Sequence, residues 1–273
     1  MDTRKPRRIL ITGGSSGIGA ALAHAYAADG VTLFLGGRDT HRLEAVAADC
    51  SDRGAAVFVR CLDVTDREGM AGWITEAGAE YPLDLVIANA GISAGTGTTN
   101  GNGGTLALED PDQVRKIMAV NVDGVVNTVF PALDQMLDGA PPESGVRGQI
   151  AIMSSLAGFR GLPGAPAYGA SKAALRSWGE GLRGHLAQHG VKVSVICPGF
   201  VVSPMTDVNP YPMPFLVATD RAARIIKNGL ARDRARIAFP WPLAVLVWLM
   251  AALPPSWLDP VVRHLPKKPA ARL

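Results

Sequence analysis

The sequence contains little that would mark a secreted, disulfide-stabilised protein. Only three of its 273 residues are cysteines, and Cys50, Cys61 and Cys197 are odd in number and widely spaced. This pattern excludes a dense disulfide framework and favours reduced structural thiols, which suits a cytosolic compartment. The basic N-terminal residues lead directly into a strand pattern and not into the apolar region of a signal peptide, so we expect no secretory signal.

Charge is also scarce, since charged residues make up 19% of the chain and the formal net charge is +3. A nucleic-acid-binding protein needs a clustered basic stripe or a recognisable binding module, and neither is present. We therefore expect no nucleic-acid partner. The apolar fraction of 48% suits one large globular α/β domain, some of whose apolar surface is covered by a partner or by lipid.

The chain lacks an apolar run long enough to cross a bilayer. The longest uniformly apolar segment, Leu243 to Leu253, lies between proline pairs and as a helix would span about 16 Å, roughly half of a hydrocarbon core. Two interpretations remain, namely burial against another subunit and insertion into one leaflet, assisted by nearby cations. These are Arg232, Arg234, Arg236, Lys267 and Lys268. We favour insertion, and predict a cytoplasmic protein that contacts the cytosolic membrane face peripherally through residues 239–257.

A glycine-punctuated turn follows the first apolar strand pattern. Here Ile9-Leu10-Ile11-Thr12 leads into Gly13-Gly14-Ser15-Ser16-Gly17-Ile18-Gly19 and then into an alanine-rich helical pattern. Such a turn lets the backbone and a helix N-terminus approach a pyrophosphate, and the glycine spacing is a variant of the dinucleotide fingerprint. We predict that Gly13, Ser15, Ser16, Gly17, Ile18 and Gly19 contact the cofactor. The alternative is an ordinary glycine-rich turn.

Six apolar runs alternate with helical patterns along the chain. Continuous Val/Ile/Leu runs are typical of parallel strands buried on both faces. We therefore predict a doubly wound parallel α/β sheet in a three-layer sandwich: a single catalytic domain (1–238) with an apolar and basic helical appendage (239–273). Loops 94–104 and 138–148 are predicted to be exposed. The expected strands are Arg8 to Thr12, Thr32 to Gly36, Ala56 to Cys61, Leu85 to Asn89, Gln149 to Ser154 and Lys192 to Cys197.

Four further elements stand in a fixed order after the glycine turn. They are Asn89-Ala90-Gly91, Ser155, the Tyr168-Gly169-Ala170-Ser171-Lys172 segment and Pro198-Gly199. Together with the turn they resemble the short-chain dehydrogenase/reductase family over roughly residues 7–235. The resemblance implies an oxidoreductase that transfers a hydride between a nicotinamide dinucleotide and a carbonyl or alcohol group.

The resemblance implies that Tyr168 is the general acid and base. A free phenol titrates near pH 10, so activity at neutral pH calls for a lowered pKa, and Lys172 lies one helical turn away on the same face. By resemblance, Lys172 also binds the nicotinamide ribose, Ser155 supports the substrate oxygen, and Asn121 holds a water that connects Lys172 to solvent. Asn121 has the alternative interpretation of a buried amide that bonds neighbouring backbone.

The end of the second strand bears on cofactor choice. An NAD site places a carboxylate there for the ribose hydroxyl, whereas Gly37 stands at that position and Arg38 follows it. Arginine suits a 2′-phosphate, so we predict a preference for NADP(H), with NAD(H) as the alternative. Asp39 complicates this prediction, and Arg38 could equally be a solvated loop residue.

Other cofactor contacts follow from the resemblance alone. Asp63 and Val64 correspond to adenine contacts, although Asp63 also suits a turn or a helix cap. The segment Asn89, Ala90 and Gly91 corresponds to an adenosine-ribose contact. Pro198, Gly199 and Ser203 lie near the nicotinamide, where Ser203 replaces the threonine that relatives commonly carry to meet the carboxamide.

The segment after Gly199 combines apolar side chains with four prolines, which is typical of a semi-rigid lid over a hydrophobic substrate. The same side chains could instead close the core; they are Phe200, Met205, Tyr211, Met213, Phe215 and Leu216. By resemblance, the glycine-containing helix face near Gly179 pairs subunits in a dimer or tetramer. We expect no metal site, because His185 and His189 have no third ligand. A second class of function is an NADP-binding sensor or scaffold without turnover, and a third is a membrane-bound interaction protein.

Overall fold

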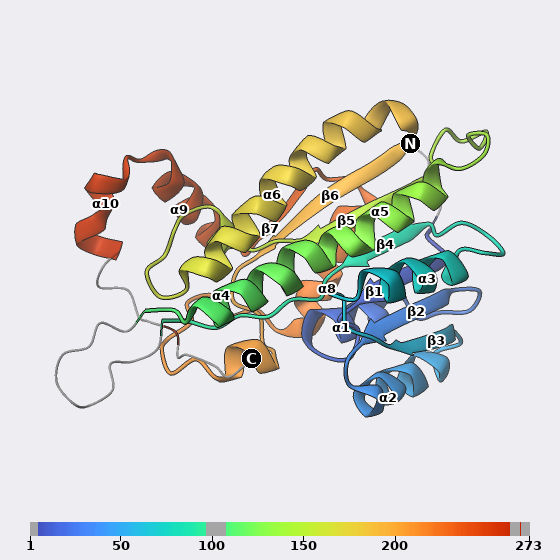
Figure 1. Cartoon of the computed structure of the whole chain (residues 1–273), viewed down its shortest axis with the longest axis horizontal. Coiled ribbons are helices and arrows are strands. Elements are labelled where there is room, and N and C mark those ends of the chain that lie inside the picture. Colours follow the sequence, from blue (N-terminus) through green and yellow to red (C-terminus); the bar gives the residue numbers. More distant parts are fainter. Residues whose placement is uncertain (1–4, 97–107, 263–267, 269–273) are drawn as a thin grey trace.

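The computed structural model describes residues 5–96, 108–262 and 268. A seven-stranded parallel sheet, in the order β3-β2-β1-β4-β5-β6-β7, carries helices on both faces (Figure 1). The predicted doubly wound fold is thus confirmed. The strands are β1 (Arg8–Thr12), β2 (Thr32–Gly37), β3 (Ala56–Cys61), β4 (Leu85–Ala88), β5 (Gly148–Met153), β6 (Val191–Pro198) and β7 (Arg236–Phe239).

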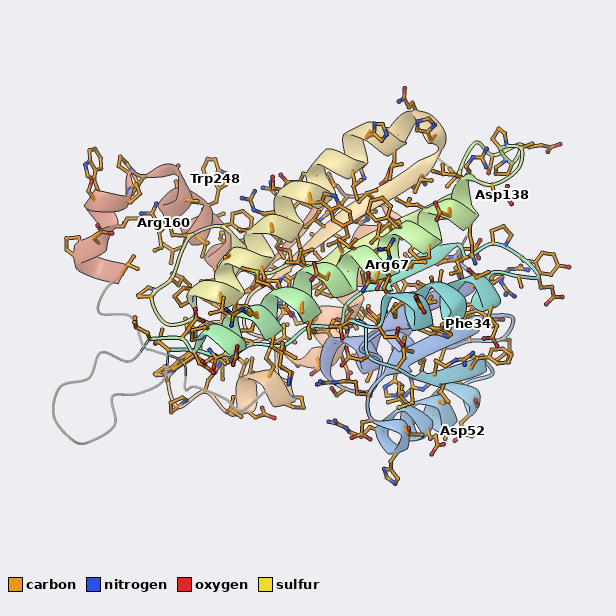
Figure 2. All side chains as sticks on the ribbon, in the orientation of Figure 1. Phe34, Asp52, Arg67, Asp138, Arg160 and Trp248 are labelled. Atoms are coloured by element: carbon orange, nitrogen blue, oxygen red, sulfur yellow. The ribbon has the colours of Figure 1, made fainter. Side chains whose placement is uncertain are left out.

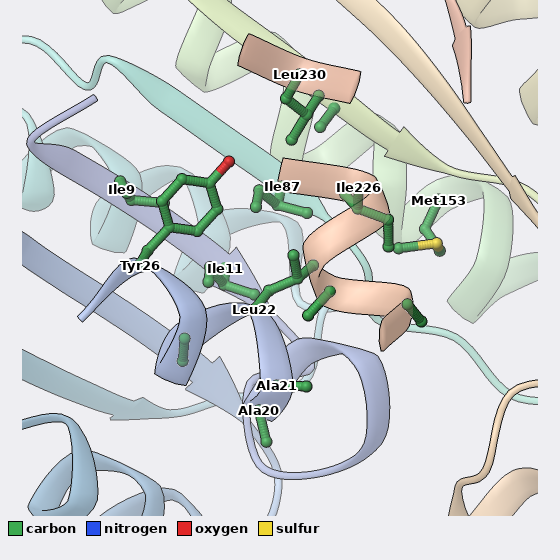
Figure 3. Close-up of a cluster of buried hydrophobic side chains, with 14 of the residues drawn as sticks. Ile9, Ile11, Ala20, Ala21, Leu22, Tyr26, Ile87, Met153, Ile226 and Leu230 are labelled. Carbon is green, nitrogen blue, oxygen red and sulfur yellow. The ribbon is translucent and has the colours of Figure 1, made fainter. Parts of the chain in front are cut away.

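The two faces of the sheet form two separate apolar cores. Successive side chains of a strand point to opposite faces, so Ile9 and Ile11 of β1 lie in one core and Leu10 in the other. The first core packs against α1 (Gly17–Tyr26), α2 (Thr40–Ser51) and α8 (Thr219–Ala231), and Figure 3 shows Leu22 of α1 beside Ile226 of α8. The second packs against α3 (Arg67–Ala77), α5 (Gly124–Leu137) and α6 (Pro166–Leu186). The helix α4 (Pro111–Met118) continues through a π-helical segment, Ala119–Asp123, into α5.

Two strands differ from the sequence-based expectation. The seventh strand, β7, was not predicted, because the four residues Arg-Ile-Ala-Phe are too short to give a pattern, and it forms by pairing with β6. The prediction of burial on both faces was wrong for β3, where Phe58 and Val59 are exposed. As the edge strand beside β2, β3 has a neighbour on one side only.

The two predicted loops turn out differently. Residues 138–148 are largely exposed, as expected. The start of the other loop is instead buried, since Ala94 packs with Ile117 and Ala167, and Thr96 donates its backbone N–H to the Gly164 carbonyl. The rest of that loop, 97–104, lies outside the described residues.

The three cysteines are free thiols. Cys50 and Cys197 are buried and Cys61 is exposed. Burial raises the pKa of Cys50 and of Cys197 to about 11, which makes both thiols unreactive at neutral pH. The structure thus agrees with reduced structural cysteines.

Two helices follow β7 and project from that edge of the sheet (Figure 1). The first, α9 (Trp241–Ala252), contains the predicted apolar segment up to Ala252, whereas α10 (Pro255–Val262) was not expected as a separate helix. Leu243 and Ala244 attach α9 by packing against Leu156, Val195 and Cys197. Among the described residues, no helix is long and apolar enough to cross a membrane.

Candidate functional site

The order of the strands brings the predicted site residues to one edge. The chain moves outward from β1 to β2 and β3, and then returns to place β4 on the other side of β1. Ligands bind beyond the carboxyl ends of the strands at such a switch point. Gly13, Asn89, Ser155 and Pro198 follow or end β1, β4, β5 and β6, so they gather at this edge.

Glycine backbone without side chains lines the site directly after β1. Gly13 and Gly17 have φ angles of +67° and +53°, which favour glycine, and a Cβ at Gly13 would lie 2.9 Å from the Ala90 Cα. A Cβ at Gly19 would overlap the Gly13 carbonyl oxygen. The helix α1 begins at Gly17, so its free N–H groups face the backbone of Gly13 to Gly19, which we call the glycine cradle. These features fit a dinucleotide pyrophosphate.

The Asn89 side chain ties the ends of β1 and β4 together. Its Nδ2 donates to the carbonyls of Thr12 and Gly13, at 3.0 and 3.2 Å. In return, the Thr12 Oγ1 accepts the backbone N–H groups of Asn89 and Ala90, at 3.0 and 3.1 Å. Asn89 therefore holds the glycine turn in place, and Thr12 is a site residue that the sequence analysis missed.

Ser15, Ser16 and Ile18 complete the turn at the start of α1. Ser16 is the N-cap residue of α1, but its side chain makes no capping bond. A Cβ at Gly37 would lie 3.5 Å from the Ser15 Oγ, which places Ser15 beside the end of β2. Ile18 packs partly buried against the first core. The end of β2 thus meets the glycine turn, as a site for an adenosine ribose requires.

Arg38 and Asp39 at the end of β2 have different environments. The Asp39 carboxylate caps α2 by accepting from the Arg42 backbone N–H at 3.0 Å and from the Arg42 Nε at 2.7 Å. These hydrogen bonds lower the pKa of Asp39. The Arg38 side chain is 59% exposed and its Nη1 lies 3.9 Å from the Asp63 Oδ2, a long contact. The guanidinium is therefore accessible to an anion, while Asp39 is engaged with Arg42.

The Asp63 side chain stabilises a turn, which is the alternative that the sequence analysis gave for this residue. Its Oδ1 accepts from the Thr65 backbone N–H and hydroxyl, at 2.9 and 2.8 Å. Burial opposes ionisation, but these hydrogen bonds and the nearby positive charges outweigh it and lower the pKa of Asp63. The buried Val64 is fixed by Asn127, whose Nδ2 donates to the Val64 carbonyl at 2.9 Å. Both residues remain predicted adenine contacts.

The structure brings Ser155, Tyr168 and Lys172 together. Tyr168 and Lys172 lie one turn apart near the start of α6, and the Lys172 Nζ is 5.8 Å from the centre of the Tyr168 ring. Ser155 forms a hydrogen bond with the Tyr168 side chain and donates to the Pro198 carbonyl at 3.3 Å. The Lys172 Nζ donates to the Met153 carbonyl at 2.9 Å. The cluster thus contains a phenol, a hydroxyl and an ammonium at the carboxyl edge of the sheet.

Burial dominates the titration of both groups on α6. It raises the pKa of the Tyr168 phenol, against the opposing effect of the hydrogen bond with Ser155, and it lowers the pKa of Lys172 to about 8. The expected lowering of the Tyr168 pKa by Lys172 is therefore not seen. The reason is geometric, since the ammonium donates to Met153 and lies over the ring at a distance. Tyr168 is consequently protonated at neutral pH.

Asn121 has the environment of a buried amide. Its Nδ2 donates to the Ile92 carbonyl and the Ser171 Oγ, both at 3.0 Å, and its Oδ1 accepts from the Ile92 N–H at 2.8 Å. Both amide hydrogens are thus engaged with protein. A Cβ at Gly91 would lie 3.1 Å from the Asn121 Oδ1 and 3.3 Å from the Lys172 Nζ. Asn121 therefore fixes the backbone that lies against Lys172, and its link to water stays a prediction.

Two further groups missed by the sequence analysis hold α6 in position. The Ser154 Oγ donates to the Lys172 carbonyl at 2.7 Å. The Glu109 Oε2 accepts the Ala167 backbone N–H at 2.9 Å in the first turn of α6. Neither residue carries a local sequence signal, because each acts on a helix distant in the chain.

The predicted nicotinamide contacts surround the end of β6. Gly199 donates its N–H to the Phe239 carbonyl at 2.7 Å, and a Cβ there would lie 2.9 Å from Leu243 of α9. Ser203 precedes α7 (Pro204–Asp207), and its Cβ would lie 3.2 Å from a Cβ at Gly17. The end of β6 thus approaches the glycine turn. The apolar segment that follows is partly exposed, notably at Phe215 and Leu216.

No metal centre accompanies this cluster. Within the described part of the chain, no three residues of His, Cys, Asp or Glu are grouped to hold a metal ion. His185 and His189 are both exposed, with ring centres 5.8 Å apart.

Comparison with known proteins gives one family. Residues 7–211 match the sequence model described as short chain dehydrogenase. An uncharacterised oxidoreductase of Myxococcus xanthus is 41% identical over 261 residues, which cover 95% of this chain and 97% of that protein. An uncharacterised oxidoreductase of Mycobacterium tuberculosis is 36% identical over 254 residues, with 91% and 94% covered.

Solved structures show the same fold. A short-chain type dehydrogenase/reductase from Mycobacterium marinum superposes with a TM-score of 0.72 at 24% identity, covering 85% of this chain and 93% of that chain. A short chain dehydrogenase from Mycobacterium paratuberculosis bound to NAD gives a TM-score of 0.69 at 21% identity, covering 84% and 93%.

Proposed function

The chain belongs to the short-chain dehydrogenase family, and on that premise we propose that it is an NADP(H)-dependent reductase of apolar carbonyl compounds. As a member of this family it is an NAD(P)-dependent oxidoreductase. The observation that supports the proposal is the cluster of the buried Ser155 and Lys172 with the partly buried Tyr168, beside the glycine cradle. When bound, the reduced dinucleotide supplies the hydride.

The residues of the chain supply the proton and stabilise the developing charge. Tyr168 is protonated at neutral pH because burial raises its pKa, so it is ready to donate its proton to the carbonyl oxygen as that oxygen becomes negative. Ser155 stabilises the same oxygen. The Lys172 ammonium stabilises the phenolate that remains, since a charge buried away from water acts through a low dielectric. Asn121 positions the backbone next to Lys172.

The preference for NADP(H) rests on charge at the end of β2. Arg38 presents an exposed guanidinium, and Gly37 leaves no carboxylate where an NAD site would carry one. The engagement of Asp39 with Arg42 supports this preference, because the carboxylate already accepts two hydrogen bonds from Arg42. One structural relative is bound to NAD, so the comparison of the two dinucleotides is part of the test.

The test is oxidation of NADPH or NADH by the purified full-length protein over a panel of aliphatic, aromatic and sugar carbonyls. We expect turnover with apolar ketones or aldehydes and a higher kcat/KM with NADPH. Dinucleotide binding without turnover on any carbonyl would instead favour the sensor or scaffold.

We also propose that α9 inserts into the surface of a lipid bilayer. Trp241, Val245, Trp248 and Leu249 form one exposed stripe of α9, and Trp257 of α10 adds a further exposed indole. Figure 2 places Trp248 at the end of the molecule formed by the C-terminal helices. Residues 237–258 contain no charged side chain. An interface with a second subunit usually forms about ten hydrogen bonds, and this surface has few side-chain groups that could form them. Tryptophan side chains on an otherwise apolar surface suit the interfacial region of a bilayer better than a second subunit.

The structure does not support the expectation that nearby cations assist this insertion. Arg232 and Arg234 precede β7, whereas α9 follows its carboxyl end, and Arg236 is paired with Glu180. Lys268 is buried, and Lys267 lies outside the described residues. We therefore expect binding that depends on apolar contact and persists on uncharged phosphatidylcholine vesicles in high salt.

Co-sedimentation with phosphatidylcholine vesicles tests this proposal. The double variant Trp241→Ser with Trp248→Ser should lose the vesicle-bound fraction, while Tyr81→Ser, which removes an exposed aromatic ring elsewhere, should keep it. The proposal would be overturned in favour of a second subunit if the wild-type protein does not bind vesicles but forms a dimer, and if the double variant is a monomer.

A further inference from the structure

We propose that Lys268 recognises substrate, and that its ammonium pairs with a carboxylate carried by the otherwise apolar carbonyl compound. The inference rests on the proposed reductase function and adds the charge of the substrate to it. Lys268 belongs to the C-terminal end of the chain, far in sequence from the family motifs.

Lys268 lies where three loops of the site meet. Its Nζ donates to the Ser93 Oγ and to the Met205 carbonyl, both at 3.1 Å. A Cβ at Gly95 would overlap both the Lys268 carbonyl and the backbone of Gly164. These contacts come from the segments that follow β4, β5 and β6. The carboxyl ends of those three neighbouring strands form the substrate side of the switch point.

The neighbours of Lys268 connect it to the catalytic cluster. Ser93 is two residues beyond Gly91, whose backbone lies against Lys172. Met205 is two residues beyond Ser203, which faces the glycine turn. Lys268 therefore spans the space between the backbone beside Lys172 and the short helix α7.

The charge of Lys268 lacks a counter-ion in the described structure. The residue is 8% exposed, and the described residues give its Nζ only two neutral oxygens as acceptors. Burial alone lowers its pKa to about 8, so it is largely protonated at neutral pH.

A buried ammonium without a partner is unfavourable, and a bound anion relieves the cost. An ammonium has three N–H donors, of which the described residues engage two. A carboxylate on the substrate would accept the third and neutralise the charge. The partly buried Met205 and Tyr211 of the lid segment suit the apolar remainder of such a molecule.

Matched substrates test the proposal. We would compare a homologous series of benzoyl-alkanoates with their methyl esters, because each pair differs only in the charge. Wild-type protein should prefer the acid of suitable length. Lys268→Met should raise the KM for that acid by about 10- to 100-fold and leave the ester unchanged, as expected for one charge-assisted hydrogen bond. Lys268→Arg should retain part of the preference, and Lys5→Met, which removes an exposed charge, should change neither.

A second measurement separates this proposal from the proposed function. The best acid, added with NADPH to the inactive Tyr168→Phe variant, should raise the thermal midpoint, and adding Lys268→Met should abolish the shift. If wild-type protein reduces the esters but shows no preference for the acids, only the recognition proposal fails. An equal effect of Lys268→Met on acid and ester would show that Lys268 merely anchors the C-terminal segment. If no carbonyl is reduced, the proposed function fails and this proposal with it.

Discussion

The Lys172 ammonium nitrogen lies 5.8 Å from the centre of the Tyr168 ring, with Lys172 buried and Tyr168 partly buried beside the buried Ser155. Burial acts on the two residues in opposite senses, because it disfavours the charged form of each. It raises the pKa of the phenol and lowers that of the amine. At neutral pH the pair therefore consists of a neutral acid next to a cation, which is the state that a carbonyl reductase needs.

Replacing Tyr168 by Phe should remove this acid. We expect turnover to fall by about 100-fold or more, since general acid catalysis contributes that much, while NADPH binding is retained. Steady-state NADPH oxidation and dinucleotide titration measure the two effects. Tyr81→Phe, which alters an exposed phenol, is the control. A Tyr168→Phe enzyme with more than roughly a tenth of the wild-type rate would mean that another group donates the proton.

Lys172 should make stability depend on pH. Burial lowers its pKa from 10.5 to about 8 in the folded protein. Between these values the unfolded chain binds a proton that the folded chain has released, so the contribution of Lys172 to stability increases with pH across this window. Wild-type protein should therefore gain thermal stability relative to Lys172→Met from pH 8 to pH 10. Melting curves of both proteins measure the gain, and parallel pH profiles would contradict it.

Arg38 should discriminate between the dinucleotides. Removing its guanidinium by Arg38→Ala should lower kcat/KM for NADPH by about 10- to 100-fold, because one or two charge-assisted hydrogen bonds to phosphate are lost. The value for NADH should change little. Arg53→Ala, beyond the end of α2 and exposed, serves as the control. Equal losses with both dinucleotides would assign Arg38 a structural role.

Two helical glycines should respond oppositely to alanine. A Cβ at Gly19 would overlap the Gly13 carbonyl, so Gly19→Ala should distort the cradle and weaken dinucleotide binding. A Cβ at Gly181 of α6 meets nothing within 4 Å, so Gly181→Ala should stabilise the protein by up to about 1 kcal/mol. Dinucleotide titration and thermal melting distinguish them. Normal cofactor affinity in Gly19→Ala would argue against the cradle.

Local spacing in the sequence predicted the relative positions of several candidate site residues. The glycines of the turn lie within seven residues, and Tyr168 and Lys172 lie within one helical turn, so their relative positions follow from local geometry alone. A continuous apolar run is also a local signal, and such runs predicted six of the seven strands of the sheet. The four residues of β7 were missed, because only pairing with β6 makes them a strand.

The tertiary structure decided what depends on contacts between distant residues. Burial sets the direction of the Tyr168 and Lys172 pKa shifts, and the sequence led us to expect the opposite direction for Tyr168. The contact of Asn89 with Gly13 and that of Lys268 with Ser93 join residues far apart in the chain. The sequence thus determined which chemical groups the protein has and the motifs that carry them. Only folding determined their neighbours and their exposure to water, because both depend on how separate segments pack.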